Sequence, residues 1–271
     1  MSADFLQVMA ASSRRRADEA RRQVSYDTLA LRARQTPMPP ALRLHPRFDL
    51  IAEIKLRSPA AGGPALASDD LPARAAAYAA GGAAAVSVLT EPSRFDGSIL
   101  HLADAARALD AHGLPAMRKD FIVDAYQLAE ARAAGAGGAL LILRLLTRAE
   151  LESLVAVARS LDLFLLLEAF DEGDLDTARS LVAALGTQGL LVGVNSRDLA
   201  TLQVRAERLF ELAPGLPKNV PCVAESGIAS AGDARAIARA GYRLGLVGSA
   251  LMACADPQAL VRDMVEAGRA S

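Results

Sequence analysis

The stretch IAEIKLRSPAAGG, residues 51–63, places two opposite charges in an apolar run and then continues into a loop of small residues. Parallel strands that are buried on both faces are continuously apolar, so Glu53 and Lys55 are unexpected inside such a strand. Side chains two residues apart on a strand point to the same side. We therefore expect both charges to lie together where a strand ends, at the edge of a functional site.

Seven more short apolar runs follow this stretch, and longer segments with the apolar period of helices separate them. The eight runs are DLIAEIK, AAAVSVLT, LPAMRKD, GALLILR, LFLLLEAF, GLLVGVNSRD, VPCVAES and LGLVGSA. Eight strand–helix units are typical of an α/β protein, either a (β/α)8 TIM barrel or a doubly wound sheet. The number of units, their similar lengths and the lack of a GxGxxG turn after the first run favour the barrel.

The chain length of 271 residues suits one large core, and barrels of this size form a single domain. Residues 1–48 lie outside the repeating pattern. They contain one or two helices over roughly residues 3–34 and then a proline-rich connector, QTPMPPALRLHP. We expect an N-terminal helical extension that packs on a barrel formed by residues 49–271.

Composition excludes several classes of function. The net charge of −1 gives no electrostatic signal for nucleic acid or for an anionic membrane. The N-terminus lacks the apolar core of a signal peptide, and the run GGALLILRLL is too short to span a bilayer and contains Arg144. Two cysteines and three histidines show no metal-ligand or triad spacing. We expect a cytoplasmic protein without a metal, a nucleic-acid partner or membrane contact.

Polar side chains gather at the C-terminal ends of five of the runs. They are Glu53, Lys55, Arg118, Lys119, Glu168, Asn195, Glu225 and Ser226. In a TIM barrel the C-terminal ends of all strands open on one face, where active sites are built. A single Glu–Lys pair could be a structural ion pair, but charges on five converging strands are costly to bury without a function. We therefore expect a catalytic site on this face.

A second group of small residues ends the last two runs, in AESG (224–227) and LVGS (246–249). Backbone N–H groups beside glycine, together with serine hydroxyls, suit a phosphate, and the loops after the last two strands are its usual site in barrels. Ordinary turn chemistry would also explain either segment alone. Their occurrence in two consecutive loops favours a phosphate site.

At these residues the sequence resembles the indole-3-glycerol phosphate synthase family, which closes the indole ring in tryptophan biosynthesis. The matching segments are IAEIKLRSP, VSVLTEPSRFDGS, MRKDFIVDAYQLAEARAAGA, LLLEAFDEGDL, GVNSRDL, VAESGI and LVGSALM. The resemblance implies a carboxy-lyase that acts on 1-(2-carboxyphenylamino)-1-deoxyribulose 5-phosphate. It also implies a phosphorylated small-molecule substrate and no cofactor.

The resemblance further implies roles for the charged residues. Lys119 would protonate the keto oxygen, and we expect nearby Lys55 and Arg118 to lower its pKa. Lys55 would face the anthranilate carboxylate or assist proton transfer. Glu168 would be the base of the dehydration step, while Glu53 and Glu225 would hold and tune the lysines.

Substrate contacts follow from the same resemblance. Asn195 would hydrogen-bond the substrate, with Arg197 nearby, and Phe95 and Phe121 would wall the anthranilate ring. The residues expected to hold the phosphate or shape its pocket are Ser58, Ser226, Gly227, Gly248 and Ser249.

The sequence departs from the family pattern at two places. Ala60 and Ala61 replace the second serine and a commonly basic residue of the SPSxG segment, and Ala169-Phe170 follow Glu168 where many members have a Val-His or similar pair. The first departure motivates an alternative function, a paralogue that acts on a substituted anthranilate. A non-catalytic phosphate-binding subunit is a further alternative, although the intact charged set argues against it. We expect a monomer or a weak homodimer.

Overall fold

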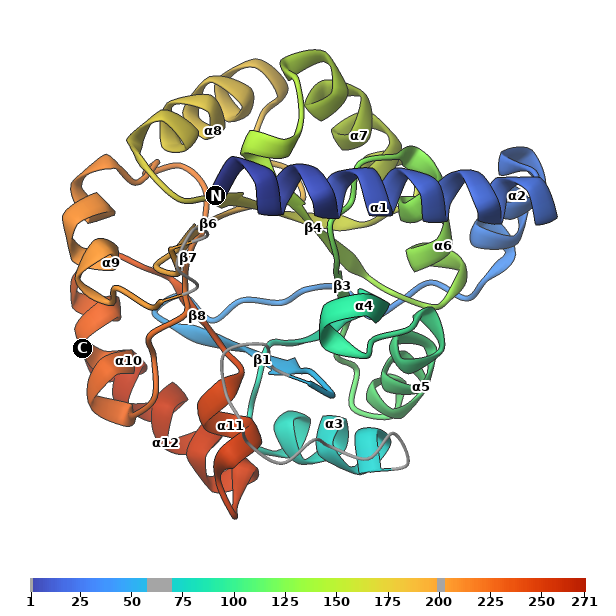
Figure 1. The fold of residues 1–271 in the computed structure, drawn as a ribbon. Coiled ribbons are helices and arrows are strands. Elements are labelled where there is room, and N and C mark those ends of the chain that lie inside the picture. The colour runs from blue at the N-terminus through green and yellow to red at the C-terminus, as the bar shows by residue number, and fades with distance from the viewer. Residues whose placement is uncertain (1, 58–69, 199–202) are drawn as a thin grey trace.

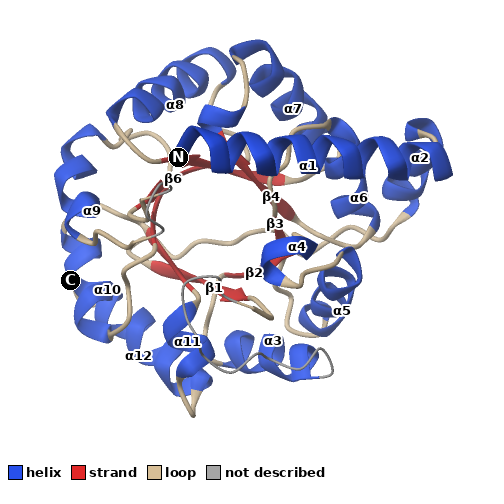
Figure 2. Ribbon diagram, viewed as in Figure 1, coloured by secondary structure: helices blue, strands red, loops and turns tan. Residues whose placement is uncertain are grey.

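The computed structural model describes residues 2–57, 70–198 and 203–271, so Ser58, Ala60 and Ala61 lie outside the described residues. The strands of the described part close into a parallel barrel, in which each strand pairs with the next and β8 pairs with β1 (Figure 2). They are β1 (Asp49–Ile54), β2 (Ala85–Leu89), β3 (Ala116–Lys119), β4 (Gly138–Ile142), β5 (Phe164–Ala169), β6 (Leu190–Asn195), β7 (Cys222–Glu225) and β8 (Leu244–Val247). The predicted (β/α)8 TIM barrel is confirmed.

Helices pack around the barrel, most of them on its outside (Figure 1). They are α1 (Ser2–Gln23), α2 (Tyr26–Gln35), α3 (Leu71–Ala80), α4 (Pro92–Phe95), α5 (Ile99–Asp110), α6 (Ala125–Ala133), α7 (Arg148–Ser160), α8 (Glu172–Leu185), α9 (Glu207–Leu212), α10 (Ala231–Arg239), α11 (Ser249–Ala253) and α12 (Pro257–Arg269). Short 3-10 turns span Leu143–Leu145 and Ala213–Gly215. Capping boxes at Asp124, Thr147 and Ser230 begin α6, α7 and α10, because their side chains satisfy free N–H groups of the first turn.

Alternate residues of each strand belong to two separate apolar cores. On β1, Ile51 packs inside the barrel, whereas Leu50 and Ala52 pack outward against the helices. On β3, Met117 likewise packs inside. Because the side-chain period of a strand is two, Lys119 shares the inward face with Met117. The alternation therefore decides which polar side chains at the strand ends enter the barrel.

The N-terminal extension lies at the C-terminal mouth of the barrel. Figure 1 shows α1 lying over one side of this mouth, in front of β4, and α2 packs against α6. The hydroxyl of Ser13 donates to the carbonyl of Phe121, and the Tyr126 hydroxyl donates to the carbonyls of Ala20 and Val24, both at 3.0 Å. These bonds fix α1 to the segment that follows β3, so the extension forms part of the wall above the barrel.

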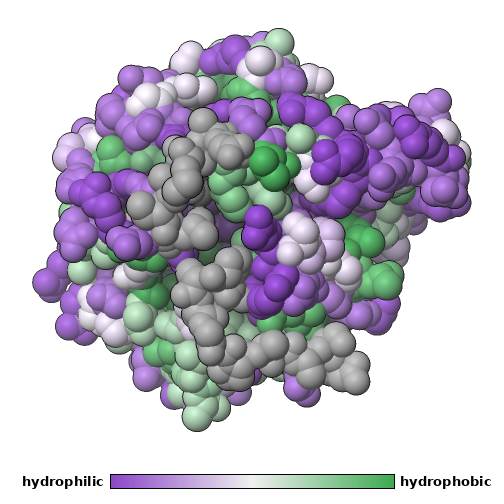
Figure 3. All heavy atoms as spheres, viewed as in Figure 1, coloured by the Kyte–Doolittle hydropathy of each residue, from purple (hydrophilic) through white to green (hydrophobic). Residues whose placement is uncertain are grey.

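The mouth face of the molecule is largely hydrophilic, including the end formed by α2 (Figure 3). Among the described helices, none combines the length and apolar character needed to cross a membrane.

Candidate active site

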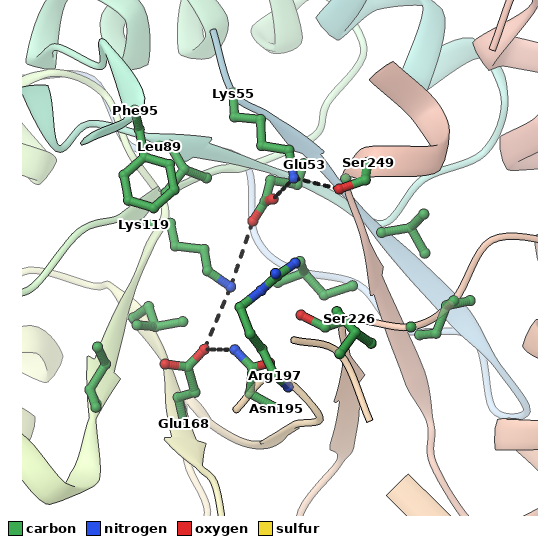
Figure 4. Close-up of a pocket in the computed structure, with 18 of the residues that line it drawn as sticks. Glu53, Lys55, Leu89, Phe95, Lys119, Glu168, Asn195, Arg197, Ser226 and Ser249 are labelled. Atoms are coloured by element: carbon green, nitrogen blue, oxygen red, sulfur yellow. Dashed lines mark hydrogen bonds and ion pairs between the residues drawn. The ribbon is translucent and has the colours of Figure 1, made fainter. Parts of the chain in front are cut away.

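A cavity of about 590 Å³ opens at the C-terminal end of the barrel (Figure 4). Inward side chains from β1, β3, β5 and β6 line it, together with residues of the loops after β7 and β8. The position agrees with the face on which barrels build their active sites.

Lys119 lies among three carboxylates. Its Nζ is 2.7 Å from Oε2 of Glu225, 3.6 Å from Oε2 of Glu53 and 3.7 Å from Oε1 of Glu168. Burial alone would lower the pKa of Lys119, but the three negative charges outweigh it and raise the pKa above its ordinary value. The expectation of a lowered pKa was wrong, because carboxylates rather than cations surround this ammonium group.

Arg118 does not join this cavity. Its guanidinium donates to the Gln127 carbonyl at 2.7 Å and to Oε2 of Glu130 at 3.0 Å, both on α6. It also donates to Oδ2 of Asp120 at 3.1 Å. The prediction that Arg118 gathers at the rim with Lys119 was therefore wrong, since successive residues of β3 point to opposite sides of the barrel wall.

Glu53 links the two lysines of the cavity. Nζ of Lys55 is 3.5 Å from Oε1 of Glu53 and donates to Oγ of Ser249 at 2.9 Å. Burial alone would raise the pKa of Glu53, but the charges of Lys119 and Lys55 outweigh it and lower the pKa. Glu53 is therefore held ionised between the two ammonium groups, and the two charges of the IAEIK segment lie side by side as expected.

Glu168 is oriented by an amide from the neighbouring strand. Nδ2 of Asn195 donates to Oε1 of Glu168 at 2.9 Å, while Oδ1 of Asn195 accepts from the Arg197 backbone N–H at 2.9 Å. Arg197 also projects into the cavity (Figure 4). The amide leaves Glu168 facing both Lys119 and the open space of the cavity.

Glu225 is fully buried, with one oxygen paired and the other without a partner. Oε2 accepts from Lys119, whereas Oε1 has no hydrogen-bonding donor within the described residues. Burial and the negative charge of Glu168 raise the pKa of Glu225 to about 8, against the opposing effect of Lys119. The space for Oε1 exists because residue 193 is glycine, where a Cβ atom would collide with it.

The expected phosphate residues lie at one end of the cavity. Ser226, Gly227, Gly248 and Ser249 all line it, and Ser249 is bonded to Lys55. Ser226 and Gly227 have φ angles of 66° and 77°, in the left-handed region that favours glycine. A Cβ at Gly248 would collide with the Glu53 carboxylate, so this glycine also makes room for a charged group.

Apolar side chains form the opposite wall. Phe95, half-buried at the end of α4, and Phe121, buried after β3, both line the cavity as expected. Phe5 of α1 was not predicted to belong to the site, yet it lines the cavity and packs edge-on against Phe121 with ring centroids 6.1 Å apart. Arg94, also not predicted, lines the cavity as well. Phe170, noted only as a departure from the family pattern, belongs to this wall as well.

Within residues 2–57, 70–198 and 203–271, no group of histidine, cysteine, aspartate or glutamate side chains is arranged to hold a metal ion. The polar side chains that line the cavity carry ammonium, guanidinium, carboxylate, amide and hydroxyl groups.

Comparisons with known proteins agree with this arrangement. The model of the indole-3-glycerol phosphate synthase family matches residues 6–264. The indole-3-glycerol phosphate synthase of Mycolicibacterium smegmatis is 45% identical over 260 residues, which cover 93% of this chain and 91% of that protein. The enzyme of that name from Mycobacterium avium is 42% identical over 259 residues, with the same coverage.

Among solved structures, thiamine phosphate pyrophosphorylase from Pyrococcus furiosus is similar, with a TM-score of 0.59 and 16% identity over 82% of this chain and 95% of that chain. That likeness shows the barrel fold alone. The family model matches most of the chain and both relatives are more than 40% identical over 93% of it, so the chain belongs to the indole-3-glycerol phosphate synthase family.

Proposed function

We propose that this chain is a decarboxylating lyase that converts 1-(2-carboxyphenylamino)-1-deoxyribulose 5-phosphate to indole-3-glycerol phosphate, carbon dioxide and water. The observation that carries the proposal is the position of Lys119, an ammonium group held among three carboxylates in a cavity of about 590 Å³. Membership of the family supports the substrate and the reaction.

Ring closure requires an acid. The ring carbon that bears the carboxylate attacks the keto carbon, and the keto oxygen gains negative charge as the new bond forms. Because its neighbours raise the pKa of Lys119, this residue is protonated and stabilises that charge before it transfers a proton. The product of this step is a hydroxyl group on the former keto carbon.

Loss of carbon dioxide and water then forms the indole. The carboxylate leaves as carbon dioxide, and its bonding electrons return to the ring. Glu168 accepts the proton from the carbon beside the hydroxyl and returns it to the hydroxyl, which departs as water. Asn195 keeps Glu168 turned toward the substrate through its bond of 2.9 Å.

The remaining cavity residues bind the two ends of the substrate. Lys55 and Arg197 offer positive charge to the anthranilate carboxylate, and Phe95 and Phe121 contact the ring. The phosphate binds at the end formed by Ser226, Gly227, Gly248 and Ser249. Ser58, the other phosphate ligand expected from the sequence, lies outside the described residues.

A substituted-anthranilate substrate was the alternative suggested by Ala60 and Ala61. Both residues lie outside the described part of the chain, and nothing in the cavity favours that alternative. The monomeric or weakly dimeric state and the cytoplasmic location remain predictions from the sequence.

The test is a fluorescence assay for indole formation without added metal. Lys119→Ala and Glu168→Gln should each lower kcat by about 10²–10⁴-fold, the usual share of an acid or base. Lys218→Ala is the matched control, since the exposed Lys218 lies outside this cavity. An inactive unmutated protein would refute the function, whereas full activity in both variants would refute only the assignment of these two residues.

A further inference from the structure

Charges are unevenly shared within the inner cluster, which we define as Glu53, Lys55, Lys119, Glu168 and Glu225. Lys55 and Arg197 act on Glu53, at the side of the cavity that faces β1. Lys119 from β3 and Glu168 from β5 act on Glu225. The single ammonium of Lys119 therefore serves both buried carboxylates on that side, and it faces Glu53 as well.

One oxygen of Glu225 is buried without a hydrogen-bond donor. Among the described residues no donor reaches Oε1, which also has no access to solvent. This oxygen lies over Gly193, the register partner of Glu168 on β5, and both carboxyl groups face Nζ of Lys119, at 2.7 Å from Glu225 and 3.7 Å from Glu168. A buried carboxylate without donors is costly, so the neutral acid is the favoured form of Glu225.

The proposed reaction also consumes a proton. The keto oxygen takes up two protons before it leaves as water, and the carbon beside it releases one. The ionised substrate carboxylate leaves as carbon dioxide and releases none. Glu168 returns the proton that it accepted, so one further proton must come from the protein in each turnover and be replaced later from solvent.

We propose that Glu225 stores this proton: it is a neutral carboxylic acid in the resting enzyme and reprotonates Lys119 after Lys119 has protonated the keto oxygen. The transfer breaks one O–H bond on Glu225 and forms one N–H bond on the neutral amine, across the 2.7 Å between Oε2 and Nζ. Glu225 is left as a carboxylate paired with an ammonium group, and it regains its proton when the product leaves.

The surroundings of Glu225 favour the neutral acid at rest. Burial and the charge of Glu168 raise the pKa of Glu225 to about 8 against the opposing effect of Lys119. The β6 neighbour Asn195 and the β8 neighbour Leu246 bring no charge to the pair. Once Lys119 has lost its proton, the protein holds a neutral amine beside a carboxylic acid, and the proton moves to the stronger base. This role rests on the proposed function, but the protonation state at rest does not.

Infrared spectroscopy tests the protonation state without any substrate. The unmutated protein should show the C=O stretch of a protonated carboxylic acid at pH 6, and this band should disappear as the pH rises beyond about 8. Glu225→Gln should lack the band, while the exposed control Glu207→Gln should retain it. In Glu168→Gln the midpoint should move to lower pH, because the like charge is gone.

Kinetics test the transfer. Glutamine keeps the shape of the neutral acid but carries no transferable proton, so Glu225→Gln should lower kcat about a hundredfold with little change in KM. In the unmutated protein kcat should fall above about pH 8 as Glu225 loses its stored proton, and Glu225→Gln should lack this decline. A resting protein without the band, or a Glu225→Gln variant with unchanged kcat and pH profile, would overturn the proposal. If the unmutated protein shows the carboxylic-acid band but forms no indole-3-glycerol phosphate, only the proposed function is overturned.

Discussion

Asp120 and Glu225 are both buried carboxyl groups that bond to basic side chains of β3, yet their pKa values move in opposite directions. Asp120 belongs to an outer network, which we define as Arg16, Thr90, Arg118 and Asp120, between the barrel wall and α1. Burial alone would raise the pKa of Asp120, but Arg118 and Arg16 lower it to about 2. Burial and Glu168 raise that of Glu225 to about 8.

The difference follows from how many hydrogen-bond donors each carboxylate receives. Oδ2 of Asp120 accepts from Arg16, Thr90 and Arg118 at 2.8 to 3.1 Å. Oδ1 accepts from Arg16 and from the Phe121 backbone N–H, both at 2.8 Å. Glu225 receives one ammonium that it shares with other carboxylates. A fully satisfied buried carboxylate stabilises the fold, whereas a poorly satisfied one is free to exchange a proton.

The largest test of this comparison removes the outer carboxylate. Asp120→Ala should lower the free energy of unfolding by about 3–5 kcal/mol, because two arginines lose their shared buried partner. Urea unfolding at pH 7 measures the loss. Asp104→Ala breaks the exposed pair between Asp104 and Arg107 and should cost less than about 1 kcal/mol. Equal losses in the two variants would contradict the assignment of Asp120 as a structural anchor.

An intermediate effect should appear in the pH dependence of stability. The folded pKa of Asp120 lies below its ordinary 3.8, so its contribution of about 2 kcal/mol is present above pH 4 and lost as the pH falls toward 2. The folded pKa of Glu225 lies above its ordinary 4.5, so its ionisation costs stability progressively as the pH rises from about 4.5 to 8.

Unfolding free energies of the unmutated protein, Asp120→Asn and Glu225→Gln over this pH range measure both effects. The free energy of unfolding of the unmutated protein should exceed that of Asp120→Asn by less as the pH falls. Relative to Glu225→Gln, the free energy of unfolding of the unmutated protein should fall toward pH 8. Difference curves with the same slope would show that the two carboxyl groups are not electrostatically distinct.

The smallest effect is expected at Arg16. Its guanidinium contacts both oxygens of Asp120, and lysine cannot reproduce such a paired contact. Arg16→Lys should cost about 1 kcal/mol of stability with kcat unchanged, since Arg118 still holds Asp120. If Arg16→Lys is fully folded under the assay conditions and its kcat is still reduced, the outer network also affects the acidity of Lys119.

The sequence was sufficient to predict the barrel and the inward position of Glu53 and Lys55, because both follow from periodicity along single strands. The same two-residue period, applied to β3, would have separated Arg118 from Lys119, and this was overlooked. The raised pKa of Lys119 was less accessible, since it depends on distances to carboxylates from three other strands.

Two further features depend on packing between distant segments. Phe5 reaches the cavity because α1 lies over one side of the mouth, and no local pattern indicates where that helix lies. Asp120 stands in the RKDF segment that suggested the family, but its five hydrogen bonds come partly from residues far away in the sequence. The sequence identifies which residues are charged, whereas the assembled fold decides which of them find hydrogen-bond and ion-pair partners.

The bond between α1 and the end of β3 has a consequence for the order in which the molecule forms. Arg16 and Asp120 are separated by 104 positions, so α1 leaves the ribosome long before its partner is made. A helix with so polar a surface gains little by collapsing early, and contacts of such separation form late in folding. We therefore expect α1 to dock onto a barrel that is already largely assembled, so a helix that is synthesised before the barrel is among the last segments to reach its place.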